Sequence, residues 1–308
     1  MTLHIPGDGR PICITPESAG WQFSGLRVLT LAPGVVETVV TGSAEMFVLP
    51  LSGALSVQVD TAAARAEASF DLAGRETVFA AVTDFAYVGR DSVLTLCSDV
   101  AAEVALPSAR CTKRLPPAYG AATGVPVEVR GAGPATRQVT NFAIPGVWDH
   151  AEKLVCCELI PPPGNWSSYP PHKHDATDPC EVVNEEIYYY RIAGPDQFRP
   201  SRQGFGLHRT YTGPEHSGAG LAELDETIEV RDGDVVLIPY GYHGPCVAAP
   251  GYPMYYLNVL AGPGGSRSTA FCDDPAHAWI RDSWSGQRPD PRCPVTSAAG
   301  RVLDGGIG

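Results

Sequence analysis

The sequence predicts a mostly β fold organised as two copies of one β-barrel, and three observations lead to this prediction. The chain has 308 residues, enough for two domains at roughly 150 residues each. Its 33 glycines and 29 prolines indicate many turns and few long helices. Short runs rich in β-branched and aromatic residues recur between these turn residues, which is typical of sandwiches and barrels.

The predicted strands are short and spread along the whole chain. They cover residues 26–31, 46–51, 55–59, 78–82, 187–192, 235–238 and 255–260. One short helix is predicted at residues 275–281, where Asp274 provides a cap and Pro275 takes the first helical position. Helical patterns with caps are hard to find elsewhere, so we expect few and short helices.

A proline-rich stretch divides the chain into two parts. Residues 106–134 contain five prolines, which favour an extended connection between domains. We therefore expect an N-terminal barrel at residues 1–105 and a C-terminal barrel at residues 135–308. Both are ordinary sizes for a domain.

A weak internal repeat relates the two parts. The segment from Glu45 to Gly53 aligns with the segment from Glu186 to Gly194, each with an acid, an apolar strand and a final glycine. Further along, residues 74–80 align with residues 233–239, where a turn glycine precedes a strand. Two matches in the same order predict that the two parts are copies of one unit.

The composition argues against several classes of partner. The formal charge is −12, from 22 Lys and Arg against 34 Asp and Glu, so a nucleic acid or an anionic membrane is not expected as a partner. The N-terminal residues lack the pattern of a signal peptide, and no apolar stretch is long enough for a membrane helix. The nine cysteines show no metal-binding spacing. We therefore expect a cytoplasmic protein in a reducing compartment, with most cysteines buried as apolar residues.

Three histidines and a glutamate in the second part have the pattern of a metal site. His172 and His174 are two residues apart, so an extended strand would point both rings to one face. Glu186 begins the next predicted strand, and His243 follows the strand at 235–238. Such a ligand set suits Zn, Fe, Mn, Ni or Co with one position open to substrate. A pair of solvated histidines is the alternative, and the combination of all four residues argues against it.

Longer motifs resemble a known family. The order of HxH, Glu and Gly, followed by G-x5-P-x-G-x-H, is similar to the two cupin motifs, with a longer loop before the Glu. Several segments resemble the 5-deoxy-glucuronate isomerases of myo-inositol catabolism. These segments are 165–175, 185–192, 239–252, 255–263 and 272–284, together with 3–6, 15–21, 23–29, 83–88, 106–110 and 137–142. The resemblance therefore covers nearly the whole chain.

The resemblance implies a bicupin, with two barrels of the jelly-roll type, that interconverts 5-deoxy-D-glucuronate and 5-dehydro-2-deoxy-D-gluconate. The substrate would be a sugar acid of the uronate type. A related ketol-isomerase holds zinc through three histidines and a glutamate, which implies zinc, or else Mn, Fe, Ni or Co, on the metal ligands His172, His174, Glu186 and His243. Glu186 is preferred to Glu185 because of its place just before the strand and because the internal repeat selects it. The N-terminal barrel has no HxH, and Asp84 stands there in place of His243, so we expect one metal per chain.

The catalytic residues are expected around this metal. Glu186 and His243 would act at the reacting centre as metal ligands. Tyr188 and Tyr190 share the strand parity of Glu186 and are predicted to be catalytic residues in the pocket, with packing of the barrel wall as the alternative. The general base stays open among these tyrosines, Glu185 and Asp175, although Glu185 is expected to face away from Glu186.

A sugar acid also requires a cation for its carboxylate. Arg191 and Arg281 are the predicted substrate-binding residues, with Arg137 and Arg209 as further candidates. Lys173 lies between the two histidines and is expected to face the opposite side of the strand. Exposed edge strands favour a homo-oligomer. Two other functions fit the same ligand set, a metal-dependent dioxygenase and a noncatalytic sugar-binding bicupin.

Overall fold

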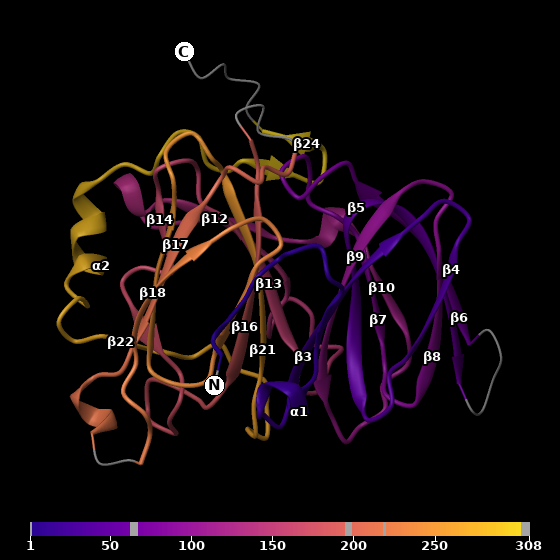
Figure 1. Ribbon diagram of the computed structural model, residues 1–308, viewed down its shortest axis with the longest axis horizontal. Coiled ribbons are helices and arrows are strands. Elements are labelled where there is room, and N and C mark those ends of the chain that lie inside the picture. The colour runs from indigo at the N-terminus through magenta and orange to yellow at the C-terminus, as the bar shows by residue number, and fades with distance from the viewer. Residues whose placement is uncertain (1, 62–66, 195–198, 218–219, 303–308) are drawn as a thin grey trace.

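Short strands separated by glycine and proline turns form nearly all of the described structure. The computed structural model describes residues 2–61, 67–194, 199–217 and 220–302. Figure 1 shows two β-barrels side by side, which confirms the predicted mostly β fold and is consistent with a bicupin. The α-helices of the described residues, α1 (Pro16–Ala19) and α2 (Ile280–Ser283), have only four residues each. None of the described helices is long and apolar enough to cross a membrane.

The first barrel is built from one curled sheet. Its strands are β2 (Ile12–Ile14), β3 (Ser24–Leu31), β4 (Val36–Val40), β5 (Ala44–Thr61), β6 (Ala68–Arg75), β7 (Phe85–Val88), β8 (Ser92–Cys97), β9 (Ala102–Arg110) and β10 (Ala118–Gly120). The long strand β5 pairs with β7 and β9 before Gly53 and with β6 and β8 after it. Gly53 has a φ of +76°, which a glycine adopts without strain, so the strand bends there and joins both walls of the barrel.

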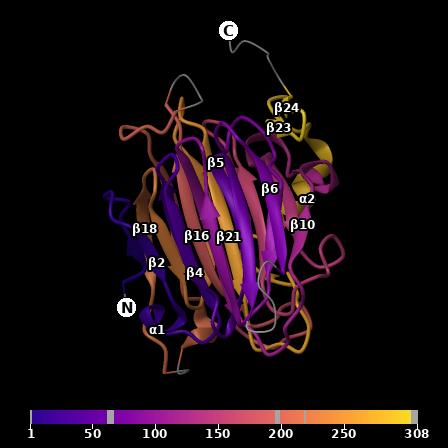
Figure 2. The ribbon, with the colours of Figure 1, turned by 90° about the vertical axis from the view of Figure 1, so that its right-hand side faces the viewer.

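The second barrel is built from two sheets. The first sheet orders β1 (His4–Ile5), β19 (Val235–Ile238), β16 (Glu185–Ile192), β21 (Met254–Ala261), β13 (Val155–Ile160), β12 (Arg137–Ala143) and β11 (Val127–Arg130). The other contains β18 (Asp225–Val230), β17 (Gly206–Tyr211), β20 (Tyr242–Ala248), β15 (His172–Lys173) and β22 (Cys272–Asp273), with β14 (Trp166–Ser167) on β20. A small hairpin of β23 (Thr296–Ser297) and β24 (Gly300–Arg301) and four 3-10 turns at 122–124, 133–135, 214–216 and 284–286 complete the elements. The strands of both barrels run in nearly the same direction (Figure 2).

Side-chain alternation divides the interior into three apolar cores. On β16, Ile187 and Tyr189 belong to a core shared by the two barrels, whereas Tyr188 and Tyr190 belong to the interior of the second barrel. On β5, Phe47 and Leu49 join the same shared core, and Val48 lies in the interior of the first barrel. Successive residues of a strand face opposite sides, so each central strand contributes to its own barrel and to the contact between barrels.

Two glutamates join the barrels in a reciprocal way. The carboxylate of Glu45 accepts hydrogen bonds from the backbone N–H groups of residues 152–154 at 2.6 to 2.8 Å. The carboxylate of Glu185 accepts from the backbone N–H groups of residues 22–24 at 2.7 to 2.9 Å. Glu45 pairs with Ala109 on β9 just as Glu185 pairs with Ala261 on β21. The internal repeat therefore aligns Glu45 with Glu185, and the predicted alignment with Glu186 is wrong by one residue.

The second half of the predicted repeat is also wrong. Residues 78–82 form turns instead of a strand, and the strand that corresponds to β19 is β7. Asp84 precedes β7 as Asp234 precedes β19, and each carboxylate accepts hydrogen bonds from two backbone N–H groups, those of residues 73 and 74 for Asp84 and those of residues 7 and 231 for Asp234. Asp84 therefore corresponds to Asp234 and not to His243. The segments that begin at Gly74 and Gly233 look alike in sequence, although Gly74 lies within β6 and Gly233 lies in the turn before β19.

Most of the other predicted elements are present with shifted bounds. Strands β3, β16, β19 and β21 cover four of the predicted runs, and the runs 46–51 and 55–59 form parts of β5. The predicted helix at 275–281 begins only at Ile280, because Asp274 instead stabilises a turn by accepting from the backbone N–H of Ala276. Within the expected connection 106–134, β9 ends at Arg110, β10 pairs with β7, and β11 pairs with β12. The N-terminal strand β1 pairs with β19 of the second barrel.

We predict that the reciprocal glutamates hold the two barrels together. Glu45→Ala should lower the free energy of unfolding by about 3 kcal/mol, because three backbone N–H groups lose a charged acceptor. Urea unfolding followed by intrinsic fluorescence measures this change. Glu37→Ala is the matched control, because Glu37 is exposed on β4 and its loss should change stability by less than about 0.5 kcal/mol. Equal stabilities of the two variants would contradict the prediction.

Candidate metal centre

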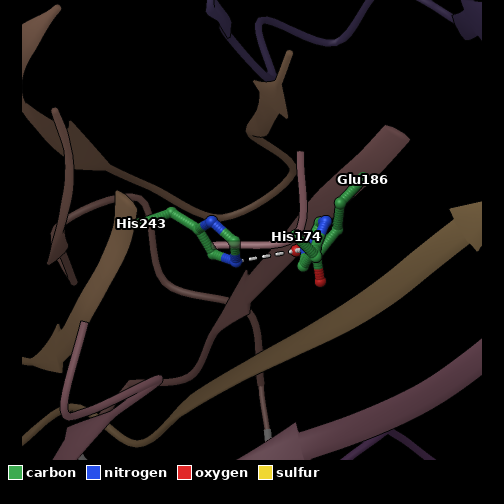
Figure 3. Close-up of side chains that lie close together, drawn as sticks. All are labelled: His174, Glu186 and His243. Atoms are coloured by element: carbon green, nitrogen blue, oxygen red, sulfur yellow. Dashed lines mark hydrogen bonds and ion pairs between the residues drawn. The ribbon is translucent and has the colours of Figure 1, made fainter. Parts of the chain in front are cut away.

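Three of the predicted ligands converge inside the second barrel. His174 follows β15, Glu186 lies on β16, and His243 lies on β20 (Figure 3). The Oε2 atom of Glu186 lies 2.9 Å from Nε2 of His174 and 3.0 Å from Nε2 of His243. One ligand atom from each residue lies within 4.8 Å of the others, and all three side chains are buried. The two sheets of the second barrel therefore bring together residues up to 69 positions apart in the chain, from His174 to His243.

Backbone carbonyls orient the rings of all three predicted histidine ligands. Nδ1 of His174 lies 3.0 Å from the carbonyl oxygen of Asn184, and Nδ1 of His243 lies 3.4 Å from the carbonyl oxygen of Gly241. In His172, Nδ1 lies 3.2 Å from the carbonyl oxygen of Pro170. A carbonyl can only accept, so in each neutral ring the proton is on Nδ1 and Nε2 carries a free lone pair. This is the arrangement found in histidines that bind a metal.

The same arrangement places acceptor atoms against each other. With Nδ1 protonated, the Nε2 atoms of His174 and His243 both present lone pairs to the carboxylate of Glu186. Nε2 of His243 is buried and has no hydrogen-bond partner of acceptable geometry. Acceptors in such a cluster require a cation between them, which is either a proton on Nε2 of a histidine or a metal ion. The donor set of two imidazoles and one carboxylate therefore fits a divalent metal ion.

Asn258 is a part of this site that the sequence analysis missed. Its Nδ2 donates to Oε1 of Glu186 at 2.5 Å, which leaves Oε2 facing the histidines. Burial raises the pKa of Glu186, but a proton on Nε2 of the neighbouring His174 or His243 outweighs burial and holds the pKa below its usual range. Glu186 is therefore a carboxylate. The sequence indicates Asn258 only as a single amide within the otherwise apolar run 254–261.

His172 lies beside the three converging residues. Its ring centroid is 4.5 Å from that of His243 and 4.6 Å from that of Phe271. Its Cα is paired with that of His243 between β15 and β20. Burial, together with the neighbouring His243, holds the pKa of His172 well below its usual range, so the ring is neutral. His172 is not within the group of ligand atoms that lie 4.8 Å or less apart.

Most of these residues line one cavity of about 360 Å³ in the second barrel. His172, His174 and Glu186 contribute to its wall, and three arginines also do so, namely Arg130, Arg137 and Arg281. Pockets for small molecules typically have volumes of roughly 300 to 1,000 Å³. The cavity therefore combines a candidate metal centre with positive charge in a space suited to a small anionic molecule.

The two predicted catalytic tyrosines have different positions. Tyr188 lines the cavity, and its hydroxyl lies 3.2 Å from Oγ of Ser168. Burial, with the nearby charge of Glu186, raises the pKa of Tyr188 well above its usual value, so the hydroxyl stays protonated at neutral pH. Tyr190 lies behind the cavity wall, where its hydroxyl lies 2.5 Å from Nδ1 of His208. Both tyrosines therefore pack in the interior of the barrel, and Tyr188 also borders the cavity.

The arginine predictions require a correction. Arg281 lines the cavity and forms a salt bridge with Asp273, with Nη2 and Oδ1 at 2.7 Å. Arg191 lies outside the cavity, because its odd position on β16 turns it away from the barrel interior. It pairs there with Asp232 at 2.8 Å and with Glu103 of the first barrel. Arg191 is therefore not placed to bind a substrate in this cavity, whereas Arg137 lines it.

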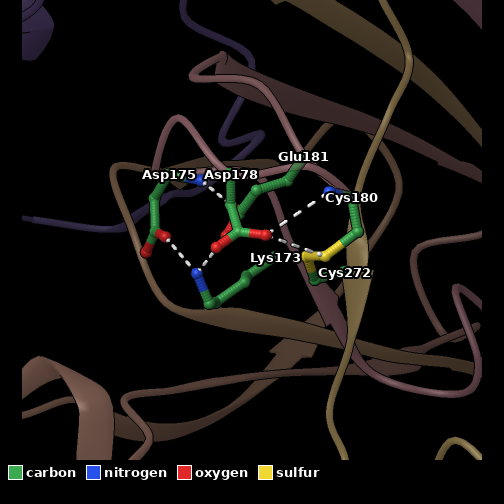
Figure 4. The surroundings of a disulfide bond; sticks show 6 residues. All are labelled: Lys173, Asp175, Asp178, Cys180, Glu181 and Cys272. Atoms are coloured by element: carbon green, nitrogen blue, oxygen red, sulfur yellow. Dashed lines mark hydrogen bonds and ion pairs between the residues drawn. A yellow bond between two sulfur atoms is a disulfide. The ribbon is translucent and has the colours of Figure 1, made fainter.

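The residues on the opposite side of β15 form a separate charged cluster. Lys173 pairs with Glu181 and, at 2.9 Å, with Asp175, which confirms that it faces away from the metal centre (Figure 4). Burial raises the pKa of Asp175, but hydrogen bonds from Gly241, His216 and Lys173 outweigh it and lower the pKa to about 2. Asp175 and Glu185 both lie outside the cavity lining, so neither is placed to act as the general base.

A disulfide lies next to this cluster. Cys180 is bonded to Cys272, which joins the loop before β16 to strand β22 (Figure 4). This differs from the expectation of reduced thiols, because two cysteines 92 residues apart have no spacing that the sequence could reveal. Cys111, Cys156 and Cys246 are buried as expected.

Comparisons with known proteins agree with this architecture. The model of the KduI/IolB family matches residues 5–280. A 5-deoxy-glucuronate isomerase of Geobacillus kaustophilus (strain HTA426) is 36% identical over 91% of this chain and 94% of its own. The enzyme of the same name from Bacillus subtilis (strain 168) is 34% identical over 87% of this chain and 91% of its own.

Solved structures show the same fold. An IolB-like protein from Salmonella typhimurium LT2 has a TM-score of 0.78 and 30% identity, and the match covers 91% of this chain and 99% of that one. An oxalate decarboxylase of Lactobacillus farciminis has a TM-score of 0.59 at 13% identity over 86% of this chain and 88% of its own. The second likeness concerns the fold alone, and it supports the bicupin architecture.

We predict that the buried triad binds one divalent metal per chain. His174→Ala should abolish stoichiometric zinc binding, because it removes an imidazole from the three converging ligands. Asn258→Ala should weaken zinc binding about 10- to 100-fold, because Asn258 orients Glu186 without touching the ion. Competition of the metal-free protein with a chromophoric chelator measures both effects. His150→Ala, whose ring contacts the carbonyl of Pro116 outside the cavity, is the control. Unchanged zinc stoichiometry in His174→Ala would rule out this site.

Proposed function

The chain belongs to the KduI/IolB family, and we propose that it interconverts 5-deoxy-D-glucuronate and 5-dehydro-2-deoxy-D-gluconate, as a 5-deoxy-glucuronate isomerase. The relatives that carry this name share a third or more of their residues with this chain over most of its length. The observation that carries the proposal is the buried triad of His174, Glu186 and His243 at a cavity suited to a small anion. The reaction moves hydrogen between two adjacent carbons of the substrate.

We propose zinc as the metal, held by the triad together with His172. Zinc accepts this combination of imidazole and carboxylate ligands in enzymes. His172 supports the proposal because it lies on the same wall, has a neutral ring and presents Nε2 as a free acceptor. When bound, a divalent cation of this kind acts as a Lewis acid toward the carbonyl and hydroxyl oxygens of the substrate.

The residues of the cavity would prepare the substrate in three ways. Glu186 keeps its charge, because Asn258 and the two histidines stabilise the carboxylate. Tyr188 keeps its proton, so its hydroxyl can donate a hydrogen bond to a substrate oxygen at the cavity wall. Both side chains are buried, and the low local dielectric strengthens their interactions with a bound substrate.

We also propose that the protein forms a homo-oligomer. Among the described strands, β4 pairs with β8 alone, and it carries exposed valines at positions 36 and 40. An exposed apolar edge strand tends to be covered by another chain. Light scattering coupled to size-exclusion chromatography should give a mass at least twice 32.6 kDa, and a monomer mass would refute this proposal.

The proposed activity predicts a specific spectroscopic result. Metal-loaded protein incubated with 5-deoxy-glucuronate should deplete the aldose signals in proton NMR and produce those of the ketose. His174→Ala and His243→Ala should lower kcat/KM by at least about 10³-fold, because the loss of metal removes several kcal/mol of charge stabilisation. His150→Ala should keep full activity. Full activity in a metal-free variant would disprove the role of the metal, and no turnover by the wild type would disprove the isomerase function.

The same experiment in D₂O distinguishes two routes of hydrogen transfer. Transfer as a proton through an enediolate exchanges with solvent and places deuterium on the product carbon. Transfer as a hydride keeps the original hydrogen. Because Glu186 is the one carboxylate among the described residues that line the cavity, we expect the product to contain little deuterium. Complete incorporation of deuterium would contradict this expectation.

A further inference from the structure

We propose that Arg137 forms the subsite that binds the carboxylate of the substrate, at the wall of the cavity that holds the metal centre. This inference rests on the proposed function, because it assigns the group that recognises a sugar acid. Four observations support it, and they concern the burial, pairing, neighbours and surroundings of this guanidinium.

Arg137 is a buried cation without an acidic partner. The residue is only 4% exposed. Its Nη1 donates to the carbonyl oxygens of Ala135 at 3.0 Å and Tyr169 at 3.4 Å, and its Nε is buried without a partner. Among the residues that the structure describes, no carboxylate forms a salt bridge with it. Charged groups are almost never buried without compensation, so this guanidinium is suited to an anion that enters the cavity.

The other two arginines of the cavity already have partners. Arg130 forms a salt bridge with Glu128, and Arg281 forms one with Asp273. Of the three guanidiniums that line the cavity, Arg137 is thus the one whose charge is not balanced by a protein carboxylate within the described structure. A planar guanidinium binds a carboxylate through two parallel N–H donors, which makes it the suitable group for an acid of fixed position.

The neighbours of Arg137 increase its demand for an anion. It lies directly opposite Arg130 across the β11–β12 pair, where like charges repel. Burial lowers the pKa of Arg137 to about 10, and the charges of Arg130 and Arg281 contribute to this lowering. The group is still protonated at neutral pH. Two positive charges, those of Arg130 and Arg137, thus lie close together in the wall of the cavity, which indicates a site for a negatively charged ligand.

The surroundings of Arg137 hold it in one position. Its guanidinium carbon lies 5.6 Å from the centre of the Trp284 ring. On the other side, Gly131 has a φ of +80°, and a Cβ there would lie only 2.8 Å from Nη1 of Arg137. A rigid donor pair loses little entropy when it binds a ligand. The carbonyl of Tyr169, which accepts from Arg137, follows Ser168, whose hydroxyl contacts Tyr188, so the cation is connected to the wall beside the metal centre.

Binding of two probes to the zinc-loaded protein tests the proposal. The probes are D-glucuronate, which has a carboxylate, and D-glucose, which does not, and isothermal titration calorimetry measures both. The wild type should prefer glucuronate. Arg137→Met should weaken glucuronate binding at least about 100-fold and leave glucose unchanged, because only the charged contact is lost. Arg137→Lys should recover part of the affinity. Arg209→Met is the matched control and should bind like the wild type, because Arg209 lies outside the cavity lining and pairs with Asp225.

Two further readouts separate this role from a structural one. Zinc content should be equal in all variants, and the Tm of ligand-free Arg137→Met should be no lower than that of the wild type, because an unbalanced buried charge is removed. Equal glucuronate affinity in Arg137→Met and the wild type would overturn the subsite. Absence of glucuronate binding to the wild type would overturn it too. If the variant loses glucuronate binding but the wild type fails to isomerise 5-deoxy-glucuronate, the subsite stands and the proposed function fails.

Discussion

The alternation of side chains along β16 is the constraint on which the rest of this structure depends. Glu186 and Tyr188 face the interior of the second barrel, where they form part of the cavity wall. Glu185 faces the other way and holds the first barrel through backbone N–H groups. A shift of one residue in this strand would exchange the two glutamates, and both the metal centre and the contact between barrels would be lost. Catalytic geometry and domain assembly are thus set by the same strand register.

Much of the fold and part of the site could be predicted because they depend on local patterns. Short β-rich runs and turn glycines predicted most of the central strands. His174, Glu186 and His243 converge as the motif indicated, and strand parity correctly placed Lys173 on the opposite face. The argument for Glu186 from the internal repeat was wrong even though the residue was right. The true equivalent of Glu45 is Glu185, since an alignment by eye cannot distinguish two adjacent acids.

The remaining features depend on contacts that no local pattern records. Arg191 looked suitable for a sugar acid, but its partner Glu103 lies 88 positions earlier in the chain and in the first barrel. Arg137 looked ordinary, and only the burial of its side chain and the absence of a described acidic partner distinguish it. Asn258 acts through Glu186, which is 72 positions away. In each case the decisive fact is which groups the folded chain brings near, and a strand-rich topology makes most of those contacts distant in sequence.

The reciprocal contacts of Glu45 and Glu185 have a consequence for how the chain can change over time. Each barrel supplies the acceptor for three backbone donors of the other, and each lays one face of its central strands on a common apolar layer. The first barrel contributes none of the candidate metal ligands found among the described residues, yet it cannot be discarded, because its removal would expose this layer to water and leave the donors without acceptors. Both barrels are therefore needed for the fold. Substitutions inside the first barrel can be tolerated, whereas the surface that it shares with the second barrel must be kept because each barrel depends on it.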